Sequence, residues 1–276
     1  MGKITVAVAQ MASSNIKSKN YEKAEKFIIE AKQKGAKVIV FPENFNYLGK
    51  YTPDIREKIP DGEFYKTMSA LAKQHNIWTL AGAVKEISED KFKAYNTSVL
   101  FSPDGEAVAK YRKIHLCDMQ SEPNTLTTES KTVIAGNQVV AVGTDIGKIG
   151  LSICYDIRFP ELFRLLTLSG AQIICIPACF GITTGSAHWE ILIRSIAVSG
   201  SCYVLASNQC STAKNKEIYW GNSMIVDPWG TVIARADQER EALITGEIDL
   251  DYANTLKNRL GSLTNRRQDV YRLEIK

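Results

Sequence analysis

The sequence predicts an α/β protein. Short apolar runs that are typical of buried strands alternate with amphipathic helical segments along the 276 residues. This length fits one large α/β domain, and the content of hydrophobic (45%) and charged residues (23%) is ordinary for a globular protein. Because no linker, low-complexity tract or charge block divides the chain, we expect a single domain over residues 1–276, built from two β-α halves of similar texture.

The first half begins with two strands and the helix between them. An apolar strand is expected at 4–9, followed by a helix at 20–34 that ends before Gly35. The second strand, 37–43, ends in a carboxylate. The remaining elements of this half are a helix at 63–75, a strand at 77–84, a hairpin of strands 95–101 and 106–111 around the turn 102–105, and a long irregular loop at 121–137.

The second half repeats this alternation of strands and helices. A buried strand leads into Cys154, and the chain then turns into a helix. The later elements are a helix at 159–169, a strand at 172–177, a helix at 187–199, a strand at 202–207, a hairpin of 222–226 and 231–236, a strand at 242–248 and a helical stretch after Asp251.

The stretch 147–161 places a cysteine at a junction between a strand and a helix. Pro160 suits the first turn of that helix, and Glu161 complements the helix dipole. A helix N-terminus beside Cys154 would favour the thiolate. The alternative is that Cys154 is a small buried hydrophobe, as most free cysteines are.

Composition excludes several classes of protein. The net charge of +4, from 34 basic and 30 acidic residues, is too small and dispersed for a nucleic-acid surface. No run approaches the ~20 apolar residues of a membrane span, and the N-terminus resembles a strand more than a signal peptide. The six cysteines form no Cys-x-x-Cys pair and the three histidines are scattered, so we expect no metal and no cofactor. Free thiols in such a chain indicate a cytoplasmic protein.

Three reactive side chains stand at the ends of predicted strands, namely Glu43, Lys113 and Cys154. Active sites of α/β folds are assembled at strand ends. A thiolate can attack a carbonyl, an ammonium can lower the thiol pKa and stabilise the oxyanion, and a carboxylate can carry the proton to the leaving amine. Alternatively, Glu43 caps a loop or pairs with a surface lysine, and Lys113 faces solvent.

These stretches resemble the nitrilase superfamily, the carbon–nitrogen hydrolases, over nearly the whole chain. Their three motifs occur in the family's order, which makes the combination specific where one motif alone would be weak. The matching stretches are 42–43, 112–116 and 150–161, with flanking matches at 95–96, 103–105, 187–190 and 226–230. The resemblance implies an α-β-β-α sandwich.

The resemblance also implies a mechanism. Cys154 would be the nucleophile that forms a thioester, and Glu43 would be the general base, then the acid that protonates departing ammonia, then the base for water. Lys113 would support the oxyanion together with the backbone N–H of Tyr155. Glu129 matches a second glutamate, which positions the substrate or the lysine in the family. Its alternative role is a solvated loop acid.

Within the superfamily the closest resemblance is to the Nit branch. That branch includes ω-amidase, which acts on 2-oxoglutaramate and 2-oxosuccinamate, and deaminated glutathione amidase. The stretches 112–118, 180–190 and 202–210 are more similar to the second type, although Ser207-Asn208 departs from its alanine-rich version. The implied reaction is hydrolysis of the terminal amide of a small 2-oxo carboxylic acid amide, deaminated glutathione or 2-oxoglutaramate, to carboxylate and ammonia.

Both substrates carry carboxylates, so the pocket requires a basic residue. Arg158 and Arg194 are the candidates. Each could instead form a structural ion pair, with Glu161 or Glu190 for instance, and we favour the structural role for Arg158.

Other functions stay open at this point. The chain could hydrolyse a nitrile or an N-carbamoyl substrate within the same superfamily. It could be a Cys–His thiol hydrolase that pairs Cys154 with His115 or His188 and uses Asn208 as the orienting residue. It could also be a non-catalytic binding protein.

A second copy of the chain is the expected protein partner. The resemblance implies a homodimer formed through the helices that follow Cys154 and His188. Apolar residues spread too widely around both helices for a single buried face: Leu162, Phe163, Leu165, Leu166 and Leu168 in one, and Ile191, Leu192, Ile193, Ile196 and Val198 in the other. The alternative is that the sheet and the tail from Asp251 cover them within one chain.

Overall fold

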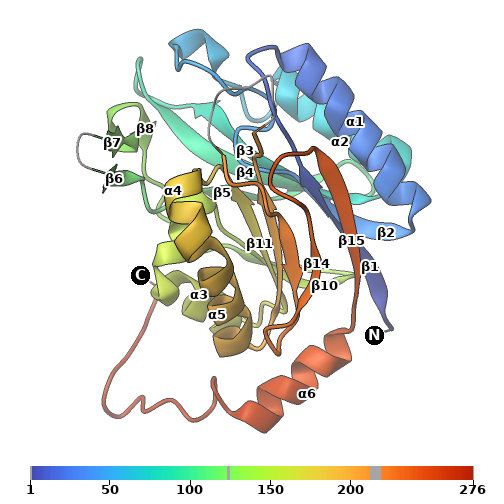
Figure 1. Ribbon diagram of the computed structural model, residues 1–276, viewed down its shortest axis with the longest axis vertical. Coiled ribbons are helices and arrows are strands. Elements are labelled where there is room, and N and C mark those ends of the chain that lie inside the picture. Colours follow the sequence, from blue (N-terminus) through green and yellow to red (C-terminus); the bar gives the residue numbers. More distant parts are fainter. Residues whose placement is uncertain (1, 123–124, 212–218, 276) are drawn as a thin grey trace.

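Two mixed β-sheets face each other and carry helices on their outer faces (Figure 1). The computed structural model describes residues 2–122, 125–211 and 219–275. The first sheet runs in the order β15 (Ala242–Ile248), β1 (Ile4–Gln10), β2 (Ala36–Val40), β3 (Trp78–Ile87), β4 (Ala94–Phe101) and β5 (Ala107–Arg112), with β8 (Val133–Ile134) beside β4. The second runs in the order β14 (Val232–Arg235), β13 (Met224–Val226), β12 (Tyr203–Asn208), β11 (Ile173–Ala178), β10 (Gly147–Leu151) and β9 (Ala141–Thr144).

Helices cover the outer face of each sheet. The pair α1 (Lys17–Gln33) and α2 (Glu63–His75) packs on the first sheet, and the pair α3 (Pro160–Leu168) and α5 (Glu190–Gly200) packs on the second. The other helical elements are α4 (Ile182–Thr184), α6 (Leu250–Leu260), a π-helical turn at 185–189 and 3₁₀ turns at 53–55, 129–131 and 154–158. This is the predicted α-β-β-α sandwich. No helix in the described part of the chain has the length and hydrophobicity that a membrane span needs.

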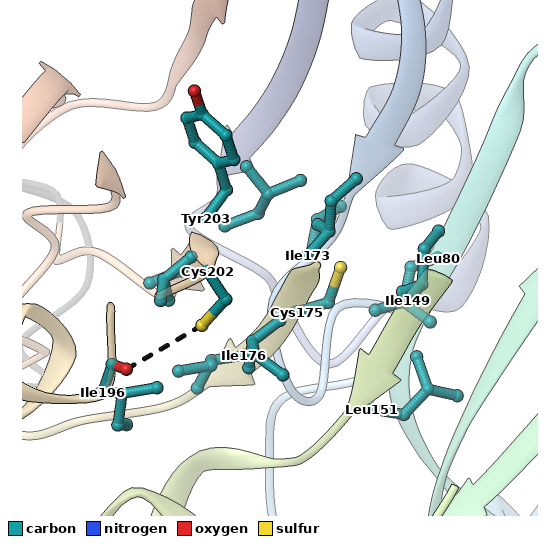
Figure 2. Packing of buried hydrophobic residues seen from close by; sticks show 14 of the residues in the cluster. Leu80, Ile149, Leu151, Ile173, Cys175, Ile176, Ile196, Cys202 and Tyr203 are labelled. Atoms are coloured by element: carbon teal, nitrogen blue, oxygen red, sulfur yellow. Dashed lines mark hydrogen bonds between the residues drawn. The ribbon is translucent and has the colours of Figure 1, made fainter. Parts of the chain in front are cut away.

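The main core lies between the two sheets. Figure 2 shows Leu80 of β3 among the same cluster of side chains as Ile149 of β10 and Ile173 of β11. Every residue of β11 and β12 is buried, because one face of these strands packs on the first sheet and the other on α3 and α5. These central strands therefore read as continuous apolar runs in the sequence.

The last strand of the chain completes the first sheet. Strand β15 pairs antiparallel with β1 along its full length, from Ala242 opposite Gln10 to Ile248 opposite Ile4. The Gln10 side chain also donates hydrogen bonds to the carbonyls of Asp237 (2.6 Å) and Arg240 (2.8 Å). These contacts tie the end of the second half to the start of the first.

Most predicted elements are confirmed, with ends that shift by a few residues. The helix at 187–199 begins earlier, at α4. The irregular loop predicted for 121–137 is wrong: it contains the strands β6 (Asp118–Glu122) and β7 (Thr125–Thr128), the 3₁₀ turn 129–131 and β8, while residues 123 and 124 lie outside the described residues. Among the described strands, β6 and β7 pair only with each other. Without a core to face, this hairpin has no apolar alternation that periodicity could detect.

Candidate active site

Glu43 is fixed just beyond the end of β2. The neighbouring N–H of Asn44 donates to the carbonyl of Ala83 (2.8 Å), and the side chain of Gln209 donates to the carbonyl of Glu43 (2.9 Å). Gly82 permits this approach, because a Cβ there would lie 2.2 Å from the carbonyl oxygen of Pro42. The Glu43 side chain is consequently buried at the edge of the sheet.

Lys113 follows β5 and is almost completely buried. Its backbone N–H donates to the carbonyl of Asn96 (2.8 Å), and its carbonyl accepts from the N–H of Gly136 (2.8 Å). Its Nζ lies 2.8 Å from Glu129 Oε2 and 3.2 Å from Glu43 Oε1. One ammonium is thus held between two carboxylates.

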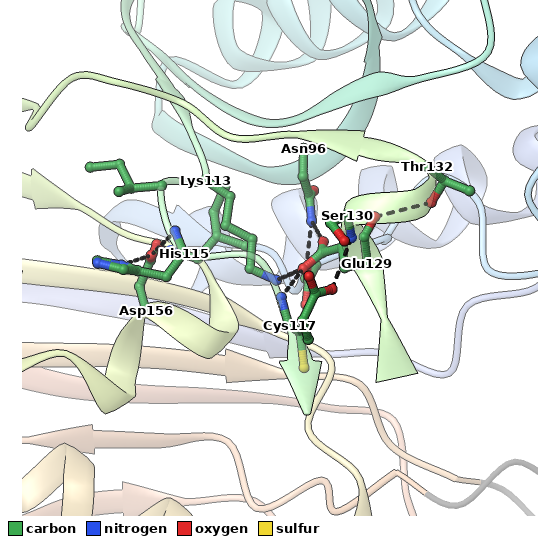
Figure 3. A network of polar contacts seen from close by, with 12 residues as sticks. Asn96, Lys113, His115, Cys117, Glu129, Ser130, Thr132 and Asp156 are labelled. Atoms are coloured by element: carbon green, nitrogen blue, oxygen red, sulfur yellow. Dashed lines mark hydrogen bonds and ion pairs between the residues drawn. The ribbon is translucent and has the colours of Figure 1, made fainter. Parts of the chain in front are cut away.

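Asn96 completes this cluster, as Figure 3 shows. Its Nδ2 donates to Glu43 Oε1 (2.7 Å) and to Glu129 Oε1 (3.0 Å). The N–H of Cys117 donates to Glu129 Oε2 (2.7 Å). Sequence reasoning gave Asn96 no role, although a polar residue in the apolar run of β4 was a usable signal.

The contacts within this cluster stabilise the charged forms of Glu129 and Lys113. Burial alone raises the pKa of Glu129, but the ammonium of Lys113 and the hydrogen bonds from Lys113 and Cys117 outweigh it and lower the pKa to about 2. For Lys113, burial lowers the pKa, and the carboxylates of Glu43 and Glu129 more than reverse this and raise it well above its ordinary value. Lys113 is therefore a permanent cation at neutral pH.

This cluster should make stability depend on acid pH. Because the pKa of Glu129 is lowered from 4.5 to about 2 on folding, its ionised form contributes stability that is complete above pH 4.5 and is lost as the pH falls through about 2. We expect the difference in unfolding free energy between the wild type and Glu129→Gln to be largest near pH 6 and to shrink towards pH 2. Urea unfolding across this range measures it. A difference that stays constant with pH would contradict the ion pairing.

Cys154 stands where β10 gives way to the 3₁₀ turn 154–158. Its φ of +47° is left-handed, a conformation that costs free energy in a residue with a Cβ and that persists only when the surroundings enforce it. The preceding Ser152 is tied to β11, since its N–H (3.3 Å) and its hydroxyl (3.0 Å) both donate to the carbonyl of Cys175. Pro160 begins α3, as predicted.

The Cys154 thiol differs from the expectation of a thiolate favoured by its position. Burial raises its pKa well above the ordinary value, and the carboxylate of Glu43 adds to the increase. The ammonium of Lys113 and the N–H of Cys179 act in the opposite direction without reversing it. Cys154 is therefore a neutral thiol at rest and needs a base before it can act as a nucleophile.

Tyr155 is the second residue of the 3₁₀ turn. The first N–H groups of such a turn have no partner within it. Among the described residues the Tyr155 N–H also has no hydrogen-bond acceptor outside the turn, so it is available to a bound group beside Cys154.

Cys154 lines a cavity of about 250 Å³. Four segments build its wall: the β6–β7 hairpin with the residue before it, the 3₁₀ turn of Cys154, residues 179–181 after β11, and helix α4. The lining residues are Cys117, Met119, Thr127, Cys154, Tyr155, Arg158, Cys179, Phe180, Gly181, Ile182, Thr183 and Thr184. Sequence reasoning missed the hairpin's contribution because it expected an irregular loop there.

The two candidate arginines lie in different surroundings. Arg194 has the structural ion pair that we favoured for Arg158, and Arg158 lines the cavity. Arg194 forms the ion pair with Glu190 (3.3 Å), donates to the carbonyl of Gly230 (2.8 Å) and lies outside the cavity. Arg158 lines the cavity, and within the described chain no carboxylate lies within ion-pair distance of it. The structural ion pair favoured for Arg158 from the sequence is therefore wrong.

Arg158 is held by aromatic side chains. Its guanidinium lies 5.6 Å from the centre of the Tyr155 ring and 5.4 Å from that of Phe180, and its Nη1 lies 3.2 Å from Nδ1 of His188. Its buried Nε has no hydrogen-bond partner in the described structure. A half-buried guanidinium without a carboxylate partner in the wall of a cavity is an anion-binding feature.

The residues of a Cys–His–Asn arrangement are not brought together. His115 contacts Asp156, and His188 contacts Arg158. Asn208 accepts from the N–H of Phe180 and donates to the carbonyl of Gly221. Neither histidine is among the residues that line the cavity.

Comparison with known proteins identifies the family. A model of the carbon-nitrogen hydrolase family matches residues 5–258. The omega-amidase NIT2 of Xenopus tropicalis is 40% identical over 278 aligned positions, which cover 100% of this chain and 99% of that protein. The deaminated glutathione amidase of Bos taurus is 38% identical over 273 positions, covering 96% and 83%.

The fold agrees with this match. The crystal structure of Saccharomyces cerevisiae Nit3, a member of branch 10 of the nitrilase superfamily, superposes with a TM-score of 0.85 at 31% identity and covers 97% of each chain. Family model, sequence and fold all agree along nearly the whole length. The chain belongs to the carbon–nitrogen hydrolase family.

Proposed function

We propose that this protein is an amidase that hydrolyses the terminal amide of a small 2-oxo carboxylic acid amide through a thioester on Cys154. The observation that carries the proposal is a cysteine with a left-handed backbone in the wall of a small cavity, together with a buried Glu43–Lys113 pair whose charges act on its thiol. The names of the two relatives, omega-amidase and deaminated glutathione amidase, support the substrate class.

The first half of the reaction forms the thioester. Glu43 Oε1 is taken by Lys113 and Asn96, whereas the described residues give Oε2 no hydrogen bond, so Oε2 is free to accept the thiol proton. The sulfur of Cys154 then attacks the amide carbon. The negative charge on the carbonyl oxygen is stabilised by Lys113 and by the N–H of Tyr155. Glu43 returns the proton to the nitrogen as the carbon–nitrogen bond breaks.

The second half regenerates the thiol. Glu43 removes a proton from water, the hydroxide attacks the thioester carbon, and the carbon–sulfur bond breaks to release the carboxylate. The sulfur recovers its proton from Glu43. Glu129 acts through Lys113, because their 2.8 Å contact fixes the direction of the ammonium.

A substrate panel tests the proposed reaction. We expect the purified protein to release 2-oxoglutarate from 2-oxoglutaramate or from deaminated glutathione, with far slower turnover of glutamine, asparagine and a simple nitrile. Product is measured by an enzymatic 2-oxoglutarate assay for the first two and as ammonia for the others. Preferred hydrolysis of the nitrile would replace the amidase assignment by another activity of the family. If no substrate turns over and a thiol probe labels Cys154 no faster than the other cysteines, a binding protein is the better description.

Arg158 is proposed to bind the substrate carboxylate. In Arg158→Met we expect kcat/KM for 2-oxoglutaramate to fall about 10- to 100-fold, mainly through KM, because a charged hydrogen-bonded pair is lost. Butyramide, which has no carboxylate, should be turned over as by the wild type. Steady-state kinetics on both amides measure this. Arg194→Met is the matched control and should leave both rates unchanged; equal losses on both amides in Arg158→Met would contradict the assignment.

A homodimer through α3 and α5 is the proposed assembly. Half of the predicted apolar residues are buried within the chain, namely Leu162, Phe163, Leu166, Ile193 and Ile196. Others remain at the surface: Ile191 is 67% exposed and lines an open groove of about 520 Å³ with Val198 and Arg194. Exposed apolar side chains beside such a groove are typical of a protein interface.

Light scattering at micromolar concentration should give the mass of a dimer or of a larger closed assembly. Ile191→Asp should shift the mass towards the monomer, because it places a charge in the apolar contact. Phe92→Asp, at an exposed apolar residue elsewhere, is the control and should leave the mass unchanged. A fully active wild-type monomer would mean that this interface does not exist.

The proposal also includes the domain organisation and the cellular location of the protein. The pairing of β15 with β1 supports a single domain over residues 1–276, because both halves contribute to the first sheet. All six cysteines are free thiols, which supports a reducing, cytoplasmic location.

A further inference from the structure

Asp156 is a completely buried carboxylate that the proposed reaction does not use. Four donors surround it. Its Oδ2 accepts from the hydroxyl of Tyr111 (2.7 Å) and from the N–H of Ile153 (2.8 Å). Its Oδ1 accepts from the N–H of His115 (3.1 Å) and lies 2.7 Å from Nδ1 of the same residue. Because an ionised carboxylate only accepts hydrogen bonds, Nδ1 carries the hydrogen.

These contacts join two segments that are distant in the sequence. The bond from Ile153 lies within the turn of the nucleophile, where Asp156 is the third residue of the 3₁₀ turn and reaches back to the residue before Cys154. The bonds from Tyr111 and His115 hold the chain on both sides of Lys113. Figure 3 shows Asp156 beside His115, next to the cluster around Lys113.

We propose that Asp156 is a positioning residue that fixes the turn of Cys154 against the segment of Lys113. This inference rests on the proposed amidase function. The left-handed φ of Cys154 is unfavourable unless contacts enforce it, and the bond from Ile153 to Asp156 is one of them. The same carboxylate holds the lysine segment, so nucleophile and cation share one anchor.

His115 serves this anchor and not the proton transfer. Its ring stacks on Phe159, with centroids 3.7 Å apart and an interplanar angle of 6°. Phe159 immediately precedes α3, so the stack connects the lysine segment to the far end of the 3₁₀ turn. His115 is therefore oriented by Asp156 on one side and by Phe159 on its face.

A set of near-isosteric variants tests the proposal. In Asp156→Asn the amide nitrogen opposes N–H donors, so at least one bond to the two segments is lost. We expect kcat per active site to fall about 100-fold, since a displacement of about 1 Å between reacting groups can cost this much. KM should change little, because no lining residue of the cavity is altered. The fraction of folded protein is measured by a thermal melt and used to correct the enzyme concentration, which removes any contribution from unfolded protein.

The pH dependence of Cys154 alkylation by iodoacetamide provides a second readout. If Asp156 fixes Lys113 near the thiol, its replacement separates them, and the alkylation profile moves to higher pH because Lys113 lowers the pKa of Cys154. If Asp156 acted through its charge alone, removing that charge would move the profile to lower pH. An upward shift supports the proposal, and a downward shift or no shift overturns it.

Tyr111→Phe keeps the ring and removes one donor, and His115→Phe keeps the stack on Phe159 and removes the ring donor. We expect both to show the same two effects as Asp156→Asn, at smaller size, so they replace it if it does not fold. Asp104→Asn, at an exposed turn, is the control and should match the wild type. Wild-type kinetics in Tyr111→Phe, His115→Phe and Asp156→Asn would overturn the positioning role, whereas full activity in Cys154→Ala would instead reject the proposed function.

Discussion

Cys154→Ala is expected to abolish turnover while the protein stays folded. Without the sulfur, water must attack the amide in one step over a single high barrier, and the rate per enzyme should fall by at least ~10³-fold. The fold should persist, because alanine removes only one atom from the side chain and the unfolding free energy should change by about 1 kcal/mol or less. Initial rates on 2-oxoglutaramate and a thermal melt measure the two expectations.

Cys179→Ala is the matched control for this loss. Cys179 lines the same cavity and is half-buried, and desolvation raises the pKa of its thiol as well. We expect this variant to keep most of the activity. Retained turnover in purified Cys154→Ala, or an equal loss in Cys179→Ala, would reject Cys154 as the nucleophile.

Lys113→Met should reduce kcat by about 10²- to 10³-fold, the usual cost of removing one donor to a developing oxyanion. It should also destabilise the protein by about 3 kcal/mol or more, because Glu43 and Glu129 would stay buried without their cation. Single-turnover kinetics and urea unfolding measure these effects. An unchanged unfolding free energy would contradict the buried ion pairs.

Glu43→Gln should also be inactive, yet it should differ in the behaviour of the thiol. Glu43 raises the pKa of Cys154 and Lys113 lowers it. The alkylation profile of Cys154 should therefore move to lower pH in Glu43→Gln and to higher pH in Lys113→Met. Shifts of the same sign in both variants would mean that one of the two charges does not act on the thiol as described.

Much of the fold could be predicted from the sequence, namely those helices and strands whose apolar residues recur at regular spacing because one face of the element is buried. The helix 63–75 has its predicted bounds because Phe64, Met68 and Leu71 recur at helical spacing and all lie in the core. The hairpin β6–β7 could not be predicted in this way. It faces the cavity and solvent, as the 67% exposure of Leu126 illustrates. Because neither face of the hairpin packs on the core, its sequence lacks the alternation of apolar and polar residues that predicts a strand.

The candidate site shows the same division. Glu43, Lys113, Glu129 and Cys154 were found through short motifs, and the structure brings the first three into one buried cluster beside the cavity of the fourth. The surroundings of Arg158 could not be found in this way. Arg194 pairs with Glu190 one helical turn away in α5, and this spacing is visible in the sequence. Whether Arg158 meets a carboxylate depends instead on how its 3₁₀ turn packs against α4 and the π-helical turn, and no local spacing encodes that packing.

The late pairing of β15 with β1 has a consequence for synthesis on the ribosome. Roughly 230 residues separate the two strands, so at ~5–20 residues per second the edge of β1 waits about 10 to 50 s for its partner. An unpaired apolar edge is a template for association with other chains. A nascent copy of this protein is therefore most exposed to aggregation, and most dependent on chaperones, until its final strand emerges.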